Sequence, residues 1–166
     1  MTEKTHSHER EIPHSHLYQL SMPIIFFMIW ILDTFIFKLT TWLNEIVISW
    51  IRMPLFIIVL VMAVIFIYLS HESIFKESHE ASDTLLTDGI LGHVRNPLYL
   101  GIMLIYVSFI MLSMSIISMI AFIFVFLVYN KMADFEAGIL EDMFGDDYLT
   151  YKSKVHKWIP SVKKRF

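Results

Sequence analysis

The sequence of 166 residues contains no cysteine. Without a thiol the chain has no disulfide framework, no thiolate zinc site, no iron–sulfur cluster, no cysteine nucleophile and no cysteine for lipid attachment. Charged residues are also few, at 17% against about 25% in soluble domains. The formal net charge of −3 argues against general nucleic-acid binding, which needs a basic surface. Composition alone therefore excludes several catalytic and binding classes.

Apolar residues are abundant and fall into long runs. They make up 56% of the chain, against about 45–50% in soluble domains. A run of about 20 apolar residues is long enough to cross the hydrocarbon core of a bilayer as a helix. The third apolar run, residues 97–129, is too long for one span. We therefore expect it to form a tight helical hairpin that turns near residues 113–118. The expected spans cover about residues 17–39, 50–69, 97–113 and 115–131. The predicted fold is an all-α integral membrane bundle of about four transmembrane helices, with residues 17–166 forming one domain.

The polar segments outside these spans predict the topology. Residues 1–16 form a polar stretch that we expect to be a flexible tail. After the last span, apolar positions recur at helical spacing, which predicts C-terminal amphipathic helices that end at Gly145 and at Pro160. Lysine and arginine are concentrated in this C-terminal part, and the positive-inside rule places it in the cytoplasm. With four spans, both termini and the polar segment 70–96 are also predicted to be cytoplasmic.

The first candidate site segment lies where the third span begins. It contains Arg95, Asn96, Pro97 and Tyr99. Pro97 suits the first position of a helix, and a helix N-terminus carries free amides and partial positive charge. The Arg95 guanidinium adds a bidentate donor for a carboxylate or phosphate, so these residues predict an anion site at the membrane surface. Gly101 would let another backbone or a ligand approach closely. The alternative is that Arg95 is an ordinary cytoplasmic anchor.

The second candidate site segment follows the last span. Glu136 lies just beyond that span, where its carboxylate can accept hydrogen bonds from a ribose or bind an ammonium group. The alternative is that Glu136 belongs to a solvated helix face.

These two segments together resemble a known family. Arg95–Gly101, which reads R-N-P-L-Y-L-G, resembles the R-[HN]-P-x-Y-x-G motif of isoprenylcysteine carboxyl methyltransferases and their prokaryotic relatives. The residues from Glu136 to Tyr151 are similar to the family's E-E-x-x-L-x-x-x-F-G-x-x-Y-x-x-Y ending. Both motifs occur in order and flank the expected hairpin, and the resemblance covers about residues 85–160.

The resemblance implies a multi-pass membrane methyltransferase that uses S-adenosylmethionine and releases S-adenosylhomocysteine. Segments 85–101 and 132–160 would build the cofactor pocket at the cytoplasmic face, and a lipid or lipid-modified substrate would enter from the bilayer. The implied catalytic residues are Arg95 and Glu136. The implied cofactor-binding residues are His93, Arg95, Asn96, Pro97, Tyr99, Gly101 and Glu136. We expect no metal site and no nucleic-acid partner.

The sequence departs from the family pattern at three positions. Ala137 and Met132 stand where the family has Glu and Arg, and Asn96 stands where His is commoner. These departures bear on the substrate more than on the cofactor. No residue is an obvious strong base, which favours a carboxylate or a neutral amine as the methyl acceptor. The pair Asn96-Pro97 also fits phosphatidylethanolamine N-methyltransferases, which gives an alternative substrate class.

The non-enzymatic alternative is a membrane scaffold or a small transporter subunit. A transporter should carry polar residues in the middle of several spans. Only Asp33 stands out in this way, so this alternative is weaker. We expect Asp33 to form a structural hydrogen bond to a neighbouring helix, with a proton relay or a substrate contact as the other possible roles.

Overall fold

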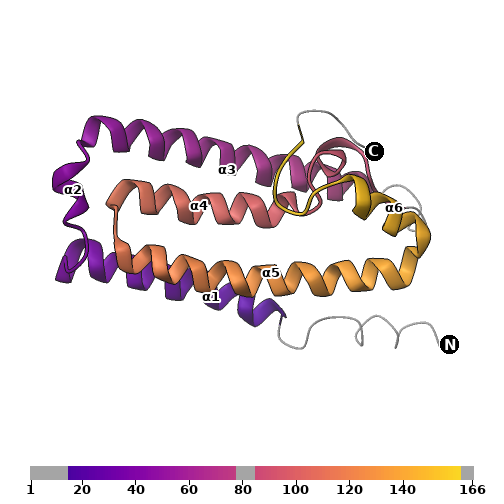
Figure 1. Ribbon diagram of the computed structural model, residues 1–166, viewed down its shortest axis with the longest axis horizontal. Coiled ribbons are helices and arrows are strands. Elements are labelled where there is room, and N and C mark those ends of the chain that lie inside the picture. Colours follow the sequence, from indigo (N-terminus) through magenta and orange to yellow (C-terminus); the bar gives the residue numbers. More distant parts are fainter. Residues whose placement is uncertain (1–14, 78–84, 162–166) are drawn as a thin grey trace.

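The computed structural model describes residues 15–77 and 85–161 and shows an all-helical chain over them (Figure 1). The main helices are α1 (Ser15–Ile31), α3 (Ser49–Glu77), α4 (Pro97–Ser113) and α5 (Ile116–Phe144). A π-helical turn, η2 (Leu32–Phe37), continues α1, and the shorter elements are α2 (Leu43–Ile46), the 3-10 turn η3 (Gly89–Gly92) and α6 (Asp146–Lys154). No strand occurs in the described ranges. The predicted all-α fold is confirmed.

Three helical segments are long and apolar enough to cross a membrane, namely Leu17–Phe37, Ser49–Ser73 and Ile116–Phe144. The fourth, α4, is a shorter apolar helix of 17 residues. Large apolar side chains cover the outside of the bundle, and Trp50, for example, is 85% exposed. Continuous apolar surfaces of this kind mark contact with lipid or with a partner. The chain is therefore a membrane-embedded bundle with three to four spanning helices.

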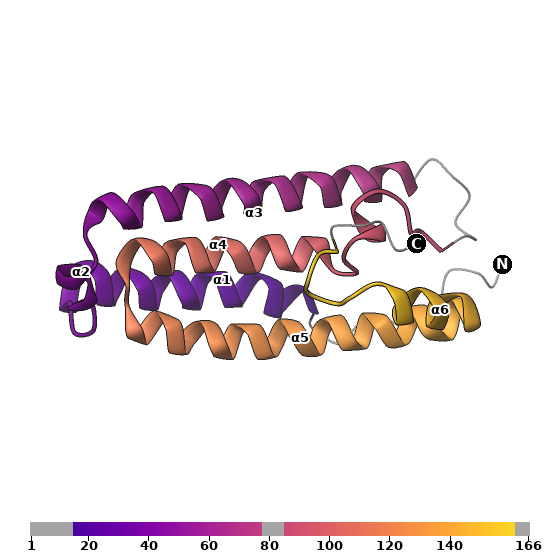
Figure 2. The ribbon, with the colours of Figure 1, turned by 45° about the horizontal axis from the view of Figure 1, so that its top comes forward.

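The long helices run side by side, and α4 lies between α3 and α5 in both views (Figures 1 and 2). α3 packs closely on α4 because Gly101 has no side chain. A Cβ at this position would stand 3.1 Å from both the Ala63 carbonyl oxygen and the Ile67 amide nitrogen. On another side of α4, the rings of Phe26 in α1 and Tyr106 pack with their centroids 4.6 Å apart. A glycine contact and an aromatic contact thus fix α4 between its neighbours.

A buried polar network closes the end of the bundle that carries α2. Asp33 in η2 is 3% exposed. It accepts hydrogen bonds from the backbone amides of Leu39 and Thr40 and from the hydroxyls of Thr40 and Ser115. The chain can turn back to Asp33 because Lys38 adopts a left-handed conformation with φ of 50°. Asp33 therefore joins η2 to the turn between α4 and α5, and the expected structural hydrogen bond is present.

Two helices extend beyond the apolar runs that predicted them. α3 continues past the expected boundary at residue 69 to Glu77, and α5 continues past residue 131 to Phe144. Hydropathy reports the thickness of lipid that a segment crosses. Glu and Lys propagate a helix almost as well as Leu does, so the helices run on into the polar region. The first of the two expected C-terminal amphipathic helices is therefore the end of α5.

Two other boundaries differ from the prediction. α6 ends at Lys154 and not at Pro160, because Val155 turns to an extended conformation and the following residues pair with the segment before α4. α1 begins at Ser15, inside the stretch predicted to be a tail. The rest of that stretch, residues 1–14, lies outside the described residues, as does the basic segment 163–165.

Candidate functional site

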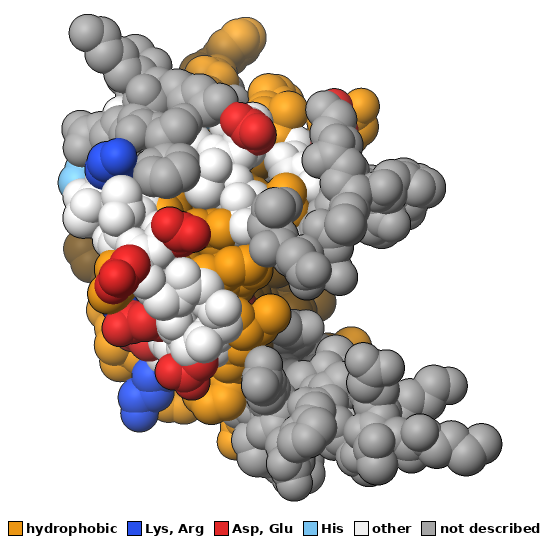
Figure 3. All heavy atoms as spheres, turned by 90° about the vertical axis from the view of Figure 1, so that its right-hand side faces the viewer, with side chains coloured by type: hydrophobic (Ala, Val, Ile, Leu, Met, Phe, Trp, Pro, Cys, Tyr) orange, Lys and Arg blue, Asp and Glu red, His pale blue; other side chains and the backbone are white. Residues whose placement is uncertain are grey.

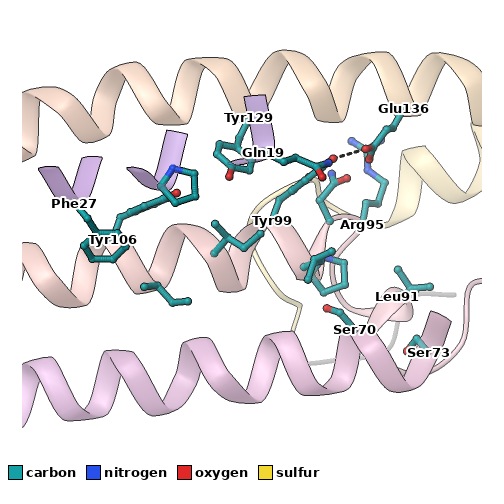
Figure 4. A pocket seen from close by; sticks show the side chains of 16 residues that line it. Gln19, Phe27, Ser70, Ser73, Leu91, Arg95, Tyr99, Tyr106, Tyr129 and Glu136 are labelled. Atoms are coloured by element: carbon teal, nitrogen blue, oxygen red, sulfur yellow. Dashed lines mark hydrogen bonds between the residues drawn. The ribbon is translucent and has the colours of Figure 1, made fainter. Parts of the chain in front are cut away.

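A cavity of about 550 Å³ lies along the first half of α4, between α1, α3 and α5 (Figure 4). α1 contributes Gln19, Pro23 and Phe27 to its wall, and α3 contributes Ser70 and Ser73. A pocket of this size falls within the range of about 300–1,000 Å³ that holds small-molecule ligands and cofactors. The cavity is therefore large enough to be a binding site.

Polar groups gather at the end of the cavity where α4 begins. One side of this end is lined by the residues around the start of α4, namely Arg95, Asn96, Pro97 and Tyr99. The other side is lined by Glu136 of α5. The Tyr99 hydroxyl donates a hydrogen bond to the Glu136 carboxylate across the two helices (Figure 4). The two segments that the sequence analysis singled out, 37 residues apart at this contact, therefore meet in one cavity.

The local sequence explains how α4 begins at this cavity. Pro97 lies in the first turn, where its missing amide costs no helical hydrogen bond. The Asn96 carbonyl accepts the first helical bond from the Leu100 amide at 3.0 Å. The Asn96 side chain does not cap the helix and lines the cavity instead. The amides of the first turn and the Asn96 side chain are thus available to a polar ligand.

The segment of residues 155–161, here called the C-terminal strap, holds the residues before α4 in place. The Arg95 amide donates to the His156 carbonyl, and the Ser161 amide donates to the His93 carbonyl, each at 3.0 Å. The His93 ring atom Nδ1 lies 2.6 Å from the Ser161 carbonyl oxygen. Arg95 therefore enters the cavity from a backbone that is fixed by two neighbouring hydrogen bonds.

The strap is itself fixed to α5. The Lys157 ammonium donates to the Asn130 side-chain oxygen at 2.8 Å and to the Asp134 carboxylate at 2.6 Å. The Trp158 indole donates to the same Asn130 oxygen at 3.0 Å. The Asp134 side chain is exposed, so its ion pair with Lys157 alone contributes little to stability. The three bonds together define where the strap crosses α5.

Tyr151 of α6 supports the loop before α4. Its side chain is buried, and its hydroxyl donates to the Leu91 carbonyl at 2.8 Å. Burial raises the pKa of this hydroxyl, the neighbouring Tyr148 raises it further, and the positive charge of Arg95 opposes the rise. Because the pKa lies above the ordinary value of about 10, the hydroxyl remains a donor at neutral pH.

The Nε atom of Arg95 is buried and has no hydrogen-bond partner among the described residues.

The structure separates the residues predicted to contact a cofactor into two groups. The residues that line the cavity are Arg95, Asn96, Pro97, Tyr99 and Glu136. His93 is not a lining residue, and its ring contacts the strap. Gly101 faces α3, where the absence of a side chain admits another backbone and not a ligand. The contact of the lining residues with a cofactor remains a prediction.

Sequence reasoning missed lining residues that lie outside both motifs. Gln19 comes from α1, and no local pattern marks it. Tyr106 and Tyr129 do carry a signal, because each lies seven residues from a motif residue, Tyr99 and Glu136 respectively. Seven residues make about two helical turns, so each pair shares one helix face.

Acidic side chains are prominent at the end of the molecule that carries α6 (Figure 3). Asp146 and Asp147 lie in the first turn of α6, and Lys152 and Lys154 lie in its last turn. This distribution complements the helix dipole, which gives these charges a structural explanation. Within the described ranges, no three or more His, Asp or Glu side chains are grouped so that they could hold a metal ion.

Comparison with known proteins gives a similarity to one methyltransferase. The chain is 33% identical over 79 residues to protein-S-isoprenylcysteine O-methyltransferase of Schizosaccharomyces pombe. The matched region is 47% of this chain and 34% of that protein, so the chain spans about a third of the length of the relative it matches. No family model and no solved structure matches the chain. The similarity supports a relationship to the isoprenylcysteine carboxyl methyltransferases, the family that the two motifs indicated.

Proposed function

We propose that this protein is an S-adenosylmethionine-dependent methyltransferase that acts in the membrane on a lipid or lipid-modified substrate. The proposed reaction is most like the carboxyl O-methylation of isoprenylcysteine. The observation that carries the proposal is that both motif segments line one cavity, where Tyr99 of the first bonds to Glu136 of the second. The similarity to the Schizosaccharomyces pombe enzyme supports the same reading.

The residues of the polar end fit S-adenosylmethionine. The Arg95 guanidinium has a buried Nε without a partner among the described residues, and a carboxylate such as that of the cofactor's methionine part would satisfy it. The Glu136 carboxylate can accept hydrogen bonds from ribose hydroxyls or bind an ammonium group. The free amides at the start of α4 offer further donors. Arg95, Asn96, Tyr99 and Glu136 would therefore hold the cofactor.

The bound cofactor would supply a methyl group on a positively charged sulfur. The protein's own residues would orient the cofactor and the acceptor and would keep water away from the acceptor. Arg95 would hold the cofactor's carboxylate, and Glu136 would hold its ribose hydroxyls or its ammonium group, which would orient the cofactor relative to an acceptor. Apolar lining residues such as Phe27, Ile102 and Ile105 exclude water from the acceptor, which makes it a better nucleophile. A carboxylate acceptor carries no proton to remove, so the site needs no general base.

The topology and the subfamily belong to the same proposal. Lys152 and Lys154 lie in α6, which stands at the end of the bundle where α4 begins (Figure 1), and Lys157 lies in the strap that bonds to the segment before α4. The positive-inside rule favours the cytoplasm for that end. Asn96 in the second position of the first motif is compatible with the prokaryotic members of the family. The proposed enzyme thus has its termini and its site at the cytoplasmic face.

Calorimetric titration of S-adenosylmethionine into detergent-purified protein tests the proposal. We expect saturable binding to the wild type and a rise in Kd of at least about tenfold for Arg95→Ala and for Glu136→Ala, since each loses a charged hydrogen bond. Asp142→Ala is the matched control, because Asp142 is an exposed acidic residue of α5 outside the cavity lining. A folded wild type that binds no S-adenosylmethionine would refute the proposal and favour the scaffold alternative.

The acceptor is tested by transfer of a labelled methyl group. N-acetyl-S-farnesylcysteine and phosphatidylethanolamine vesicles are offered separately to the wild type. Methylation of the farnesylcysteine carboxyl group supports the proposed reaction. Methylation of phosphatidylethanolamine alone would retain the cofactor and replace the acceptor.

A further inference from the structure

The antiparallel helices α4 and α5 place two pairs of side chains in the same register along the cavity. The outer pair is Tyr99 and Glu136, and the inner pair is Tyr106 and Tyr129. All four residues line the cavity (Figure 4). Each inner residue is separated from its outer counterpart by seven residues, or roughly 10 Å along the helix. The Tyr129 ring packs edge-on against the Tyr99 ring, with the centroids 5.5 Å apart, so the cavity has a second polar layer that adjoins the first one deeper in the bundle and that neither motif includes.

The Tyr106 ring is held rigidly in this inner layer. The residue is 1% exposed, and its ring packs against Phe26, Phe27 and Phe122 with centroids at 4.6, 6.1 and 6.5 Å. Its hydroxyl is buried and makes no hydrogen bond of acceptable geometry with any described residue. A buried unpaired hydroxyl is costly, and Phe would fill the same space without that cost.

The inner pair keeps a hydrogen-bond donor for a ligand. The Tyr129 hydroxyl lies close enough to the Tyr106 hydroxyl to interact with it electrostatically, although the two form no hydrogen bond of good geometry. Two hydroxyls carry two donors, and they can share only one bond between them. At least one O–H group of the pair is then left for a group that enters the cavity.

We propose that Tyr106 and Tyr129 recognise the methyl acceptor by donating hydrogen bonds to its carboxylate. This inference rests on the proposed function and assigns the acceptor's place in the same cavity. The acceptor's apolar chain lies against Phe27, Ile102 and Ile105, which line the cavity beside the inner pair. One carboxylate oxygen receives the hydroxyl bonds, and the other remains available for methylation.

The chemistry of the inner layer favours a carboxylate over an ammonium group. A tyrosine hydroxyl can donate to a carboxylate oxygen, and its oxygen can also accept from a protonated amine. The discrimination therefore rests on where the acidic side chains of the cavity lie, because a buried ammonium group needs a carboxylate partner. Among the described lining residues, the only acidic side chain is Glu136, and it lies in the outer layer with Tyr99. The inner layer offers donors and apolar surface, which is the combination that a lipid-linked carboxylate needs.

Binding of two matched ligands tests the inference without relying on turnover. N-acetyl-S-farnesylcysteine and N-acetyl-S-farnesylcysteamine differ only in the carboxylate. We expect the wild type to bind the first at least about tenfold more tightly. Tyr106→Phe and Tyr129→Phe are expected to reduce this preference, and the double variant to abolish it. Tyr68→Phe is the control, because Tyr68 is 67% exposed on α3 outside the cavity lining and its hydroxyl contributes nothing to the preference.

Cofactor binding and thermal unfolding separate this role from other roles. If the inference is right, the double variant keeps the wild-type Kd for S-adenosylmethionine, unfolds at no lower temperature, and shows a raised KM for the acceptor. Equal affinity of the wild type for both ligands overturns the inference, and so does an unchanged preference in the double variant. A raised Kd for S-adenosylmethionine in that variant assigns the pair to the cofactor instead. Failure of the wild type to bind S-adenosylmethionine is a different outcome, because it refutes the proposed function itself.

Discussion

Replacing Gly101 by alanine is expected to destabilise the protein, whereas the same replacement at Gly138 is expected to stabilise it. Both glycines lie inside long helices, Gly101 in α4 and Gly138 in α5. Their surroundings differ. An added Cβ at Gly138 meets nothing within 4 Å, whereas at Gly101 it meets α3. The pair of variants therefore isolates the effect of helix packing from the effect of helix propensity.

The expected magnitudes follow from these contacts. Alanine in place of glycine gains about 1 kcal/mol in an open helix, which is the effect expected at Gly138. At Gly101 the new Cβ would stand 2.7 Å from Ile67 Cγ1 and 3.1 Å from the Ala63 carbonyl oxygen and the Ile67 amide nitrogen. Overpacking costs about 1–3 kcal/mol, and the backbone contacts cannot relax unless α3 moves. We expect a cost near the upper limit and a net loss of about 1–2 kcal/mol.

Thermal unfolding in detergent, followed by circular dichroism, measures both variants. A change of 1 kcal/mol shifts Tm by about 2–4 °C in a chain of this size, so the two variants should differ by roughly 4–12 °C. Combining Gly101→Ala with Ile67→Ala, and comparing it with Ile67→Ala alone, should recover only part of the loss. The side-chain contact is removed in that background, but the backbone contacts remain.

A Gly101→Ala protein as stable as Gly138→Ala would refute the close packing of α3 on α4. It would also return Gly101 to the cavity as a candidate ligand contact.

Two further predictions concern single hydrogen-bonding groups. Asp33→Asn is expected to lower the free energy of unfolding by about 1–3 kcal/mol, because an amide NH2 group in the place of Oδ2 cannot accept from the hydroxyls of Thr40 and Ser115, which both donate to that oxygen. Thermal unfolding measures this loss, and an unchanged Tm would contradict it. Tyr151→Phe is expected to cost about 1 kcal/mol through loss of the bond to Leu91. Since burial raises the pKa of Tyr151 in the folded state, its advantage over Phe is full below pH of about 10 and declines at higher pH, where the unfolded chain ionises first. Tm values of both proteins between neutral and alkaline pH test this, and a constant difference would show that the hydroxyl is not protected from ionisation.

Sequence patterns predicted the number and type of the membrane helices better than their ends. The apolar runs located α1, α3 and the α4–α5 hairpin because a bilayer demands a minimum apolar length. They did not predict that α3 reaches Glu77 or that α5 reaches Phe144. Once a helix has left the lipid, packing and propensity decide where it stops, and hydropathy carries no information about either. The π-helical turn η2 was not predicted either, and its Asp33 accepts a hydrogen bond from Ser115, which lies 82 residues further along the sequence.

The candidate site was predictable where it rested on a contiguous motif. Arg95 and Tyr99 both line the cavity, and their contact with a cofactor stays a prediction. His93 and Gly101 stand in or beside the same motif, but they face the strap and α3. Which face of a motif points inward depends on the partners around it. Gln19 could not be predicted, since only the folded bundle brings α1 beside α4 and α5.

The strap is synthesised after the membrane helices and after the site residues that it holds in place. Residues 155–161 follow all the membrane helices that the structure describes, yet they supply the backbone partners of His93 and Arg95. During translation the helices can therefore enter the membrane and pack while the segment that carries Arg95 still lacks those partners. The pocket is finished only when the strap has left the ribosome and folded back across α5. A chain interrupted before residue 155 would keep its membrane anchor and every residue that lines the cavity, but it would lack the hydrogen bonds that fix Arg95 in place.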